Sequence, residues 1–143
     1  MLDETNYKID ENNSLLILDD DQPFLKRLSV AMEKRGFNVF PASSMADFSR
    51  IIKSNCPNYA IIDLRLSDGT GLDAVESIRN INPESKIIVL TGYGAIATAV
   101  AAVKIGAIDY LSKPADANDI LNALVFSDQS KPPRQSTRCQ QIG

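Results

Sequence analysis

The chain has 143 residues, 44% hydrophobic and 23% charged, with a net charge of −3, which is the composition of one ordinary globular domain. It has no apolar run near the roughly 20 residues that cross a membrane and no signal peptide, so we expect a cytoplasmic protein without membrane contact. It contains no histidine, so any imidazole chemistry must come from a partner, which excludes Ser-His-Asp and Cys-His nucleophiles within the chain.

The first half of the chain alternates apolar runs with helical patterns. The continuous apolar run 15–18 predicts a strand covered on both faces, and the spacing of apolar residues in 23–35 predicts a helix. A shorter strand is expected at 37–40. The next helix is expected to begin after a cap, either Ser43 or Ser44.

The second half continues the alternation. The apolar run 59–62 predicts a third buried strand, which ends at Asp63, and the turn-rich segment 67–71 predicts a loop. The remaining apolar patterns predict alternating helices and strands, at 72–81, 86–90, 95–105, 108–111 and 116–126.

The order of these elements predicts an α/β fold. Strands that alternate with helices form a parallel sheet with helices on both faces and right-handed crossovers. The most apolar strands, the first, third and fourth, should lie in the centre, and the weaker second and fifth at the edges. We therefore predict a flavodoxin-like, doubly wound five-stranded parallel sheet of order 2-1-3-4-5 with five helices.

Polar residues follow several of these strands where they end, namely Asp19, Asp20, Asp63, Thr91 and Lys113. The carboxyl ends of parallel strands meet at one edge of the sheet, so we expect these side chains to gather there. Clustered carboxylates repel each other and need a cation, which could be Mg²⁺ or the Lys113 ammonium. Such a site suits a phosphoryl group, with Asp63 as the nucleophile and Mg²⁺, Lys113 and Thr91 binding the phosphoryl oxygens.

Taken together, these residues resemble the receiver domain of two-component response regulators over about residues 14–126. The resemblance implies that a sensor histidine kinase phosphorylates Asp63. It also implies that Asp20 binds Mg²⁺ directly, that Asp19 acts largely through water, and that the Arg65 main-chain carbonyl completes the metal site.

The resemblance further implies a conformational switch. Thr91 and Tyr110 would form the switch pair, and the Lys113–Pro114 peptide bond would be cis. The switch would alter the face made by the fourth helix, fifth strand and fifth helix, which is also the expected surface for a homodimer.

Three longer stretches resemble the RegA/PrrA/ActR group of redox-responsive regulators, at 20–25, 64–72 and 90–100. That group places a DNA-binding helix-turn-helix after a short linker and thereby controls transcription. The polar segment 127–143 is too short for such a module, so we expect a tail or truncated linker without an effector domain, and a flexible acidic leader at 1–13. A truncated chain, an altered reading frame and a true single-domain regulator remain open.

The same residues bear on three alternative functions. A single-domain receiver could act by protein–protein interaction or as a phosphate sink. A phosphatase with an aspartate nucleophile usually has a second Asp two residues later, where this chain has Arg65. A flavin carrier of this topology needs a hydroxyl- and glycine-rich loop after the first strand, where this chain has three acids. We therefore expect a signalling domain rather than an enzyme, with at most self-catalysed phosphotransfer and dephosphorylation.

Overall fold

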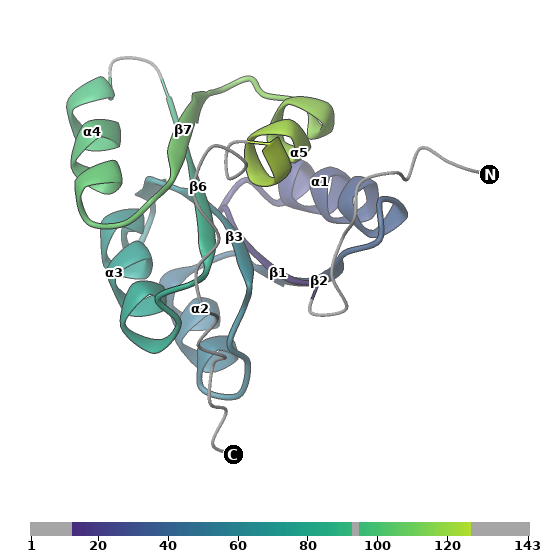
Figure 1. Ribbon diagram of the computed structural model, residues 1–143, viewed down its shortest axis with the longest axis horizontal. Coiled ribbons are helices and arrows are strands. Elements are labelled where there is room, and N and C mark those ends of the chain that lie inside the picture. Colours follow the sequence, from purple (N-terminus) through teal and green to yellow (C-terminus); the bar gives the residue numbers. More distant parts are fainter. Residues whose placement is uncertain (1–12, 93–94, 127–143) are drawn as a thin grey trace.

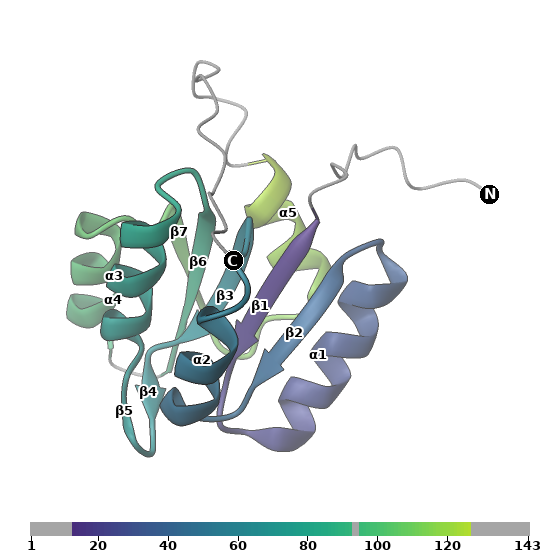
Figure 2. The same cartoon turned by 90° about the horizontal axis from the view of Figure 1, so that it is seen from below.

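Five apolar runs of the sequence form the parallel strands of one sheet. The computed structural model describes residues 13–92 and 95–126, so the expected leader and tail, apart from Asn13, fall outside the described residues. The strands lie in the order β2-β1-β3-β6-β7 (Figure 2). Their bounds are Ser14–Leu18 for β1, Asn38–Ala42 for β2, Tyr59–Asp63 for β3, Lys86–Thr91 for β6 and Asp109–Ser112 for β7. The predicted order is confirmed, since β6 and β7 are the fourth and fifth strands of this sheet.

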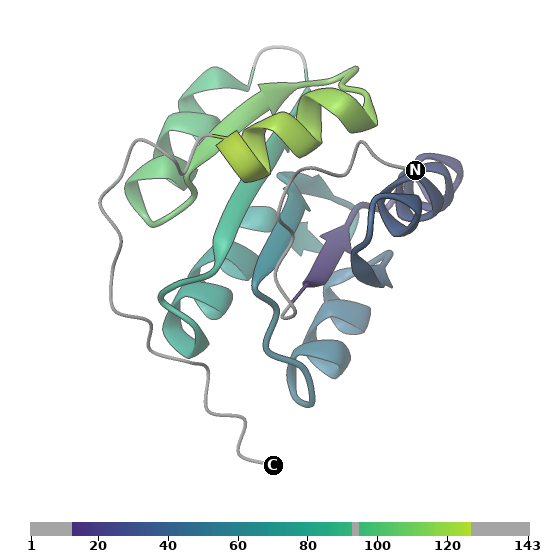
Figure 3. The ribbon, with the colours of Figure 1, turned by 45° about the vertical axis from the view of Figure 1, so that its right-hand side comes forward.

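Helices cover both faces of the sheet. Their bounds are Gln22–Lys34 for α1, Met45–Ile52 for α2, Gly71–Ile81 for α3, Ile96–Lys104 for α4 and Ala117–Phe126 for α5. The helices α2, α3 and α4 lie on one face (Figure 1), and α1 and α5 lie together on the other (Figure 3). Within the described part of the chain, no helix has the length and apolar character needed to span a bilayer.

Two hydrophobic cores result from the alternation of side chains along the central strands. On β1, Leu15 and Ile17 face the core formed with α1 and α5, whereas Leu16 and Leu18 face the core formed with α2, α3 and α4. All four side chains are fully buried, and each contributes about 1.5–3 kcal/mol through removal from water. The continuous apolar runs are therefore explained by burial on both faces.

Side-chain oxygens cap α1 and α2, which follow the carboxyl ends of β1 and β2. Asp21 accepts a hydrogen bond from the Phe24 N–H at 3.1 Å at the start of α1. Ser44, one of the two predicted candidates, caps α2 and accepts from the Asp47 N–H at 3.0 Å. The other serine, Ser43, instead donates to Asp47 Oδ2 from both its N–H and its hydroxyl, at 3.1 and 3.0 Å.

The structure differs from the expected elements in two places. Strand β2 runs two residues beyond the predicted 37–40 and includes Pro41, which is tolerated because β2 is an edge strand. The predicted loop at 67–71 contains part of a small antiparallel hairpin, in which Arg65–Leu66 (β4) pairs with Gly69–Thr70 (β5). Two-residue strands are too short to produce a periodic pattern, so the sequence did not indicate this hairpin.

The Arg79 side chain ties together two turns at the amino-terminal ends of β6 and β7. Its guanidinium donates to the Ser85 carbonyl at 3.0 Å, to the Gly106 carbonyl at 2.6 Å and to the Pro83 carbonyl. Gly106 has a φ of +131°, a conformation that favours glycine. The turn after α3 and the turn after α4 are therefore held to one another at the end of the sheet opposite the carboxylates.

Candidate functional site

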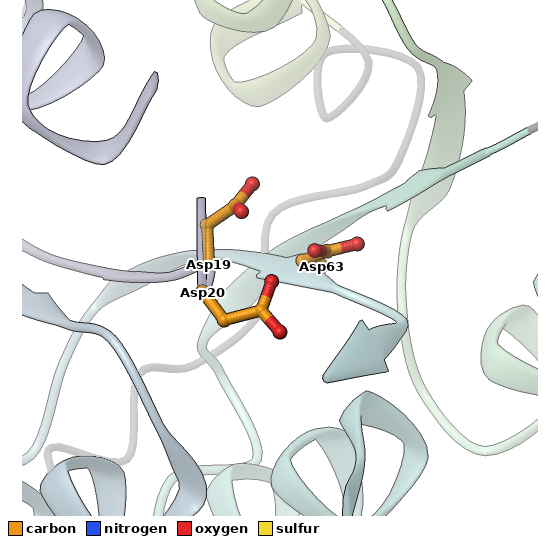
Figure 4. Close-up of side chains that lie close together, drawn as sticks. All are labelled: Asp19, Asp20 and Asp63. Atoms are coloured by element: carbon orange, nitrogen blue, oxygen red, sulfur yellow. The ribbon is translucent and has the colours of Figure 1, made fainter. Parts of the chain in front are cut away.

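Three carboxylates meet at the carboxyl ends of two neighbouring strands. Asp19 and Asp20 follow β1, Asp63 ends β3, and β1 pairs with β3 in parallel. Each of the three offers a carboxylate oxygen within 4.8 Å of the others. Figure 4 shows the three side chains close together. Asp19 and Asp63 are buried, whereas Asp20 is half-buried. The chain thus brings like charges together in a place where water screens them poorly.

Lys113 supplies the opposite charge. It follows β7, and its Nζ lies 2.9 Å from Asp19 Oδ2 and 3.6 Å from Asp63 Oδ2. The ammonium also lies 4.9 Å from the centre of the Phe24 ring, within range of a cation–π contact. The Lys113–Pro114 peptide bond is cis, as the resemblance implied.

Burial and charge shift the protonation of Asp63. Burial raises the pKa of its carboxyl group to about 6, with a further contribution from the Asp19 carboxylate, while Lys113 and the Arg65 N–H act in the opposite direction. The pKa of Lys113 behaves differently. Burial alone would lower it, but the contacts with Asp19 and Asp63 outweigh burial and raise the pKa above its usual value. At neutral pH, Asp63 is therefore mostly ionised and Lys113 remains charged.

The donor set fits a divalent cation. Asp19 Oδ1 accepts a hydrogen bond from the Asp21 N–H at 2.9 Å, whereas its buried Oδ2 receives no aligned hydrogen bond from the described residues and lies 2.9 Å from Lys113 Nζ. Convergent carboxylate oxygens of this kind are the ligands that Mg²⁺ prefers. The backbone of Arg65 runs beside the cluster, since its N–H lies 3.4 Å from Asp63 Oδ1.

Thr91 and Tyr110 lie on neighbouring strands. Thr91 ends β6 and is buried, and its hydroxyl donates to the Gly92 carbonyl at 3.2 Å. Tyr110 pairs with Val89 in the register of β6 and β7 and packs, half-buried, against the core beneath α2, α3 and α4. By alternation Thr91 is on the same face of the sheet as Val89, so the two predicted switch residues share one face.

Two neighbouring residues have roles that the sequence pattern did not assign. Asp21 belongs to the run of three acids but caps α1, and it is not one of the three carboxylates of the cluster. Ser67 lies in the predicted turn-rich loop, and its N–H and hydroxyl both donate to Asp20 Oδ2 at 2.8 Å. No local sequence pattern indicates this contact, because the two residues are 47 positions apart.

Comparison with known sequences identifies relatives over most of the chain. Residues 15–125 match the family described as the response regulator receiver domain. The photosynthetic apparatus regulatory protein RegA of Rhodovulum sulfidophilum is 60% identical over 130 residues, which cover 91% of this chain and 71% of RegA. The acid tolerance regulatory protein ActR of Rhizobium meliloti is 59% identical over 117 residues, which cover 82% of this chain and 60% of ActR.

Solved structures of the same fold support this relationship. A response regulator from Burkholderia pseudomallei, determined with a phosphorylated aspartic acid, a calcium ion and citrate, is 34% identical with a TM-score of 0.75, covering 82% of this chain and 70% of that chain. A receiver domain from Clostridium thermocellum is 32% identical with the same TM-score of 0.75, covering 82% of this chain and 94% of that chain. On the match of residues 15–125 and the identity with RegA, the chain belongs to the response regulator receiver domain family of two-component systems.

Proposed function

We propose that Asp63 is the residue that receives the phosphoryl group. The observation that carries this proposal is the position of its carboxylate, in a group with Asp19 and Asp20 and 3.6 Å from the Lys113 ammonium. A carboxylate with a pKa of about 6 is mostly ionised at neutral pH and can act as a nucleophile. The phosphorylated aspartic acid of the Burkholderia pseudomallei structure agrees with this assignment.

The 143 residues contain no histidine, so we assign the physiological phosphoryl donor to a separate sensor histidine kinase. In the proposed reaction, an Asp63 oxygen attacks the phosphorus of a phosphohistidine on a sensor histidine kinase. The O–P bond forms as the P–N bond breaks, and the histidine nitrogen keeps the electron pair of that bond. Lys113 stabilises the charge of the transferred group, because its ammonium already lies beside the attacking carboxylate.

Asp19, Asp20 and Asp63 are the side chains that would hold Mg²⁺, together with the main-chain carbonyl of Arg65. The bound ion would neutralise charge on the phosphoryl oxygens. Asp19 and Asp20 support the ion rather than the covalent step, so their replacement should reduce phosphorylation without moving it to another residue.

The phosphorylated state would be transmitted through Thr91 and Tyr110 to α4, β7 and α5. Three apolar side chains, Ile96, Val100 and Val103, recur at helical spacing along α4 and are 50%, 43% and 39% exposed. Such an apolar stripe is expected at an interaction surface. We assign it to binding a second copy of the chain or a downstream partner after phosphorylation.

Transcription control is the output that the relatives favour. Besides RegA and ActR, the transcriptional regulatory protein GlrR of Escherichia coli is 33% identical over 110 residues, which cover 77% of this chain and 25% of GlrR. We propose that a module outside the 143 residues binds DNA, and that phosphorylation of the receiver controls this module. A DNA-binding assay on the full gene product, with and without phosphorylation, tests this step separately from the chemistry at Asp63.

The phosphorylation site is tested with acetyl phosphate and with beryllofluoride, each with and without Mg²⁺. We expect a Mg²⁺-dependent phosphoryl adduct on Asp63, located by mass spectrometry of peptides, and no adduct in Asp63→Asn. The matched control is Asp21→Asn, which removes a neighbouring carboxylate but keeps a good helix cap and should still be phosphorylated. An adduct on another residue, or one that forms equally well without Mg²⁺, would contradict the assignment.

A further inference from the structure

Ser67 makes two hydrogen bonds to a single carboxylate oxygen in the cluster. Its backbone N–H and its hydroxyl both lie 2.8 Å from Asp20 Oδ2. No other residue in the described ranges donates to Asp20, so these two bonds determine how its carboxylate is turned. Because both donors act on Oδ2, the second oxygen, Oδ1, keeps its lone pairs for another ligand.

The same contact fixes the hairpin that carries Ser67. This hairpin contains β4 and β5 and begins with Arg65, so Asp20 holds it against the carboxyl end of β1. On its other side, Asp68 Oδ1 accepts a hydrogen bond from the Met45 N–H, at the first residue of α2, at 3.0 Å. The hairpin is therefore attached at two points, and one of them is a candidate metal ligand.

Without Ser67, Asp20 would be a half-buried carboxylate that is free to rotate beside Asp63. A carboxylate that must be ordered when the ion binds gives a weaker site than one that is already held in place. The two hydrogen bonds also draw some negative charge from Asp20, which acts against metal binding. This loss of charge falls mainly on Oδ2. We therefore expect the ordering of Oδ1 and of the Arg65 segment to have the larger effect on the affinity for Mg²⁺.

We propose that Ser67 is a positioning residue for the divalent cation. It orients the Asp20 carboxylate and holds the β4–β5 hairpin against the carboxyl end of β1, and both effects raise the affinity for Mg²⁺. The proposal rests on the function proposed above, since it assumes that Asp20 binds the ion. It assigns a role in metal binding to a loop hydroxyl that does not itself belong to the carboxylate cluster.

The experiment measures Mg²⁺ affinity without any phosphoryl donor. The free energy of unfolding is obtained from urea titrations followed by circular dichroism, at a series of MgCl₂ concentrations, and its rise gives the apparent Kd. Ser67→Ala keeps the N–H and loses the hydroxyl, whereas Ser67→Thr keeps both donors. Ser43→Ala is the matched control, because Ser43 makes the same pair of bonds to a carboxylate oxygen, that of Asp47, outside the cluster.

Ser67 is exposed, so we expect an effect at or below the low end of the roughly 10–100-fold loss that is usual for residues that support metal ligands, namely a loss of affinity of about three- to tenfold in Ser67→Ala. Ser67→Thr should bind Mg²⁺ like the unchanged protein. Ser43→Ala can lower stability in the absence of metal but should leave the Kd unchanged. In an Asp20→Asn background, Ser67→Ala should have no further effect on the Kd, because its target is already lost.

The outcomes separate this inference from the proposed function. If Ser67→Ala binds Mg²⁺ as tightly as the unchanged protein, or Ser43→Ala loses as much affinity, the positioning role of Ser67 is wrong while the metal site stands. If the unchanged protein shows no Mg²⁺-dependent gain in stability, the proposed metal site fails and the inference fails with it.

Discussion

Lys113 Nζ lies 2.9 Å from Asp19 Oδ2, although the strands that carry these residues, β7 and β1, are separated in the sheet by β3 and β6. The contact is possible because a long lysine side chain reaches across the carboxyl end of the sheet and passes over the Phe24 ring. One ammonium group thus links two distant strands and compensates the charge of both buried carboxylates.

Replacement of Lys113 by Met should destabilise the protein in the absence of divalent ions. Asp19 and Asp63 would then lie together without a compensating cation, and we expect a loss of about 1–3 kcal/mol at pH 7, since Lys113 is partly exposed. Urea unfolding measures the loss, and added Mg²⁺ should restore part of it. Lys26→Met, at an exposed position of α1, is the control and should change stability little.

The free energy of unfolding should depend on pH through the titration of Asp63. Its pKa is about 6 in the folded protein against a usual value of 3.8, so the folded state binds more protons between these pH values. The contribution of Asp63 to the free energy of unfolding is therefore fully present below pH 3.8 and is lost as the pH rises through 6. The loss is at most about 3 kcal/mol, because one pKa unit corresponds to about 1.4 kcal/mol.

This contribution is isolated by comparison with Asp63→Asn, because other carboxylates also titrate in this range. In metal-free buffer, Asp63→Asn should be more stable than the unchanged protein at pH 7, and the difference should shrink as the pH falls toward 4. A constant difference between the two proteins across this range would show that the Asp63 carboxyl group is not perturbed in the fold.

Gly71 should not tolerate a side chain. A Cβ at this position would lie 2.4 Å from the Asp63 carbonyl oxygen and 2.8 Å from Ile62 Cγ2, so α3 or β3 would have to move. We expect Gly71→Ala to cost about 1–3 kcal/mol in unfolding free energy and to weaken phosphorylation, because the displaced backbone is that of Asp63. Gly92→Ala is the control for stability, since nothing lies within 4 Å of its added Cβ.

The fold could be predicted almost completely from the sequence, because its signals are periodic and the central strands are buried on both faces. Asp63, Thr91 and Lys113 could be named because each stands where an apolar run ends, and strand ends converge in a parallel sheet. The hairpin at Arg65–Thr70 and the Ser67–Asp20 contact could not be predicted. The two-residue strands of the hairpin are too short for a periodic pattern, and Ser67 contacts a residue 47 positions earlier, for which no local pattern exists.

Thr91 should be needed for signal transmission more than for phosphorylation. In Thr91→Ala, we expect Asp63 still to be modified by acetyl phosphate, while the change at Tyr110 is lost, because the hydroxyl that should turn from the Gly92 carbonyl toward the phosphoryl group is absent. NMR chemical shifts of β7 and α4 before and after addition of beryllofluoride measure this change. Thr91→Ser retains the hydroxyl and should behave like the unchanged protein.

The apolar stripe on α4 should mediate association of the activated protein. We expect sedimentation velocity to show self-association with beryllofluoride and Mg²⁺, and Val100→Asp to abolish it by placing a charge in the middle of the stripe. Val30→Asp changes an equally exposed valine on α1, on the other side of the sheet, and should leave association intact. Loss of association in both variants would indicate a general effect of charge rather than an interface on α4.

The Arg79 contacts give α4 two unequal ends. Its carboxyl-terminal end continues into the turn whose Gly106 carbonyl is held by the Arg79 guanidinium at 2.6 Å. Its amino-terminal end begins after Ala95, which provides no side-chain cap, and follows the Thr91 strand end. Because α4 is held at its carboxyl-terminal end, far from the carboxylates, a small shift near Thr91 would rotate the helix about that end. Such a rotation would displace the exposed Ile96 more than Val103.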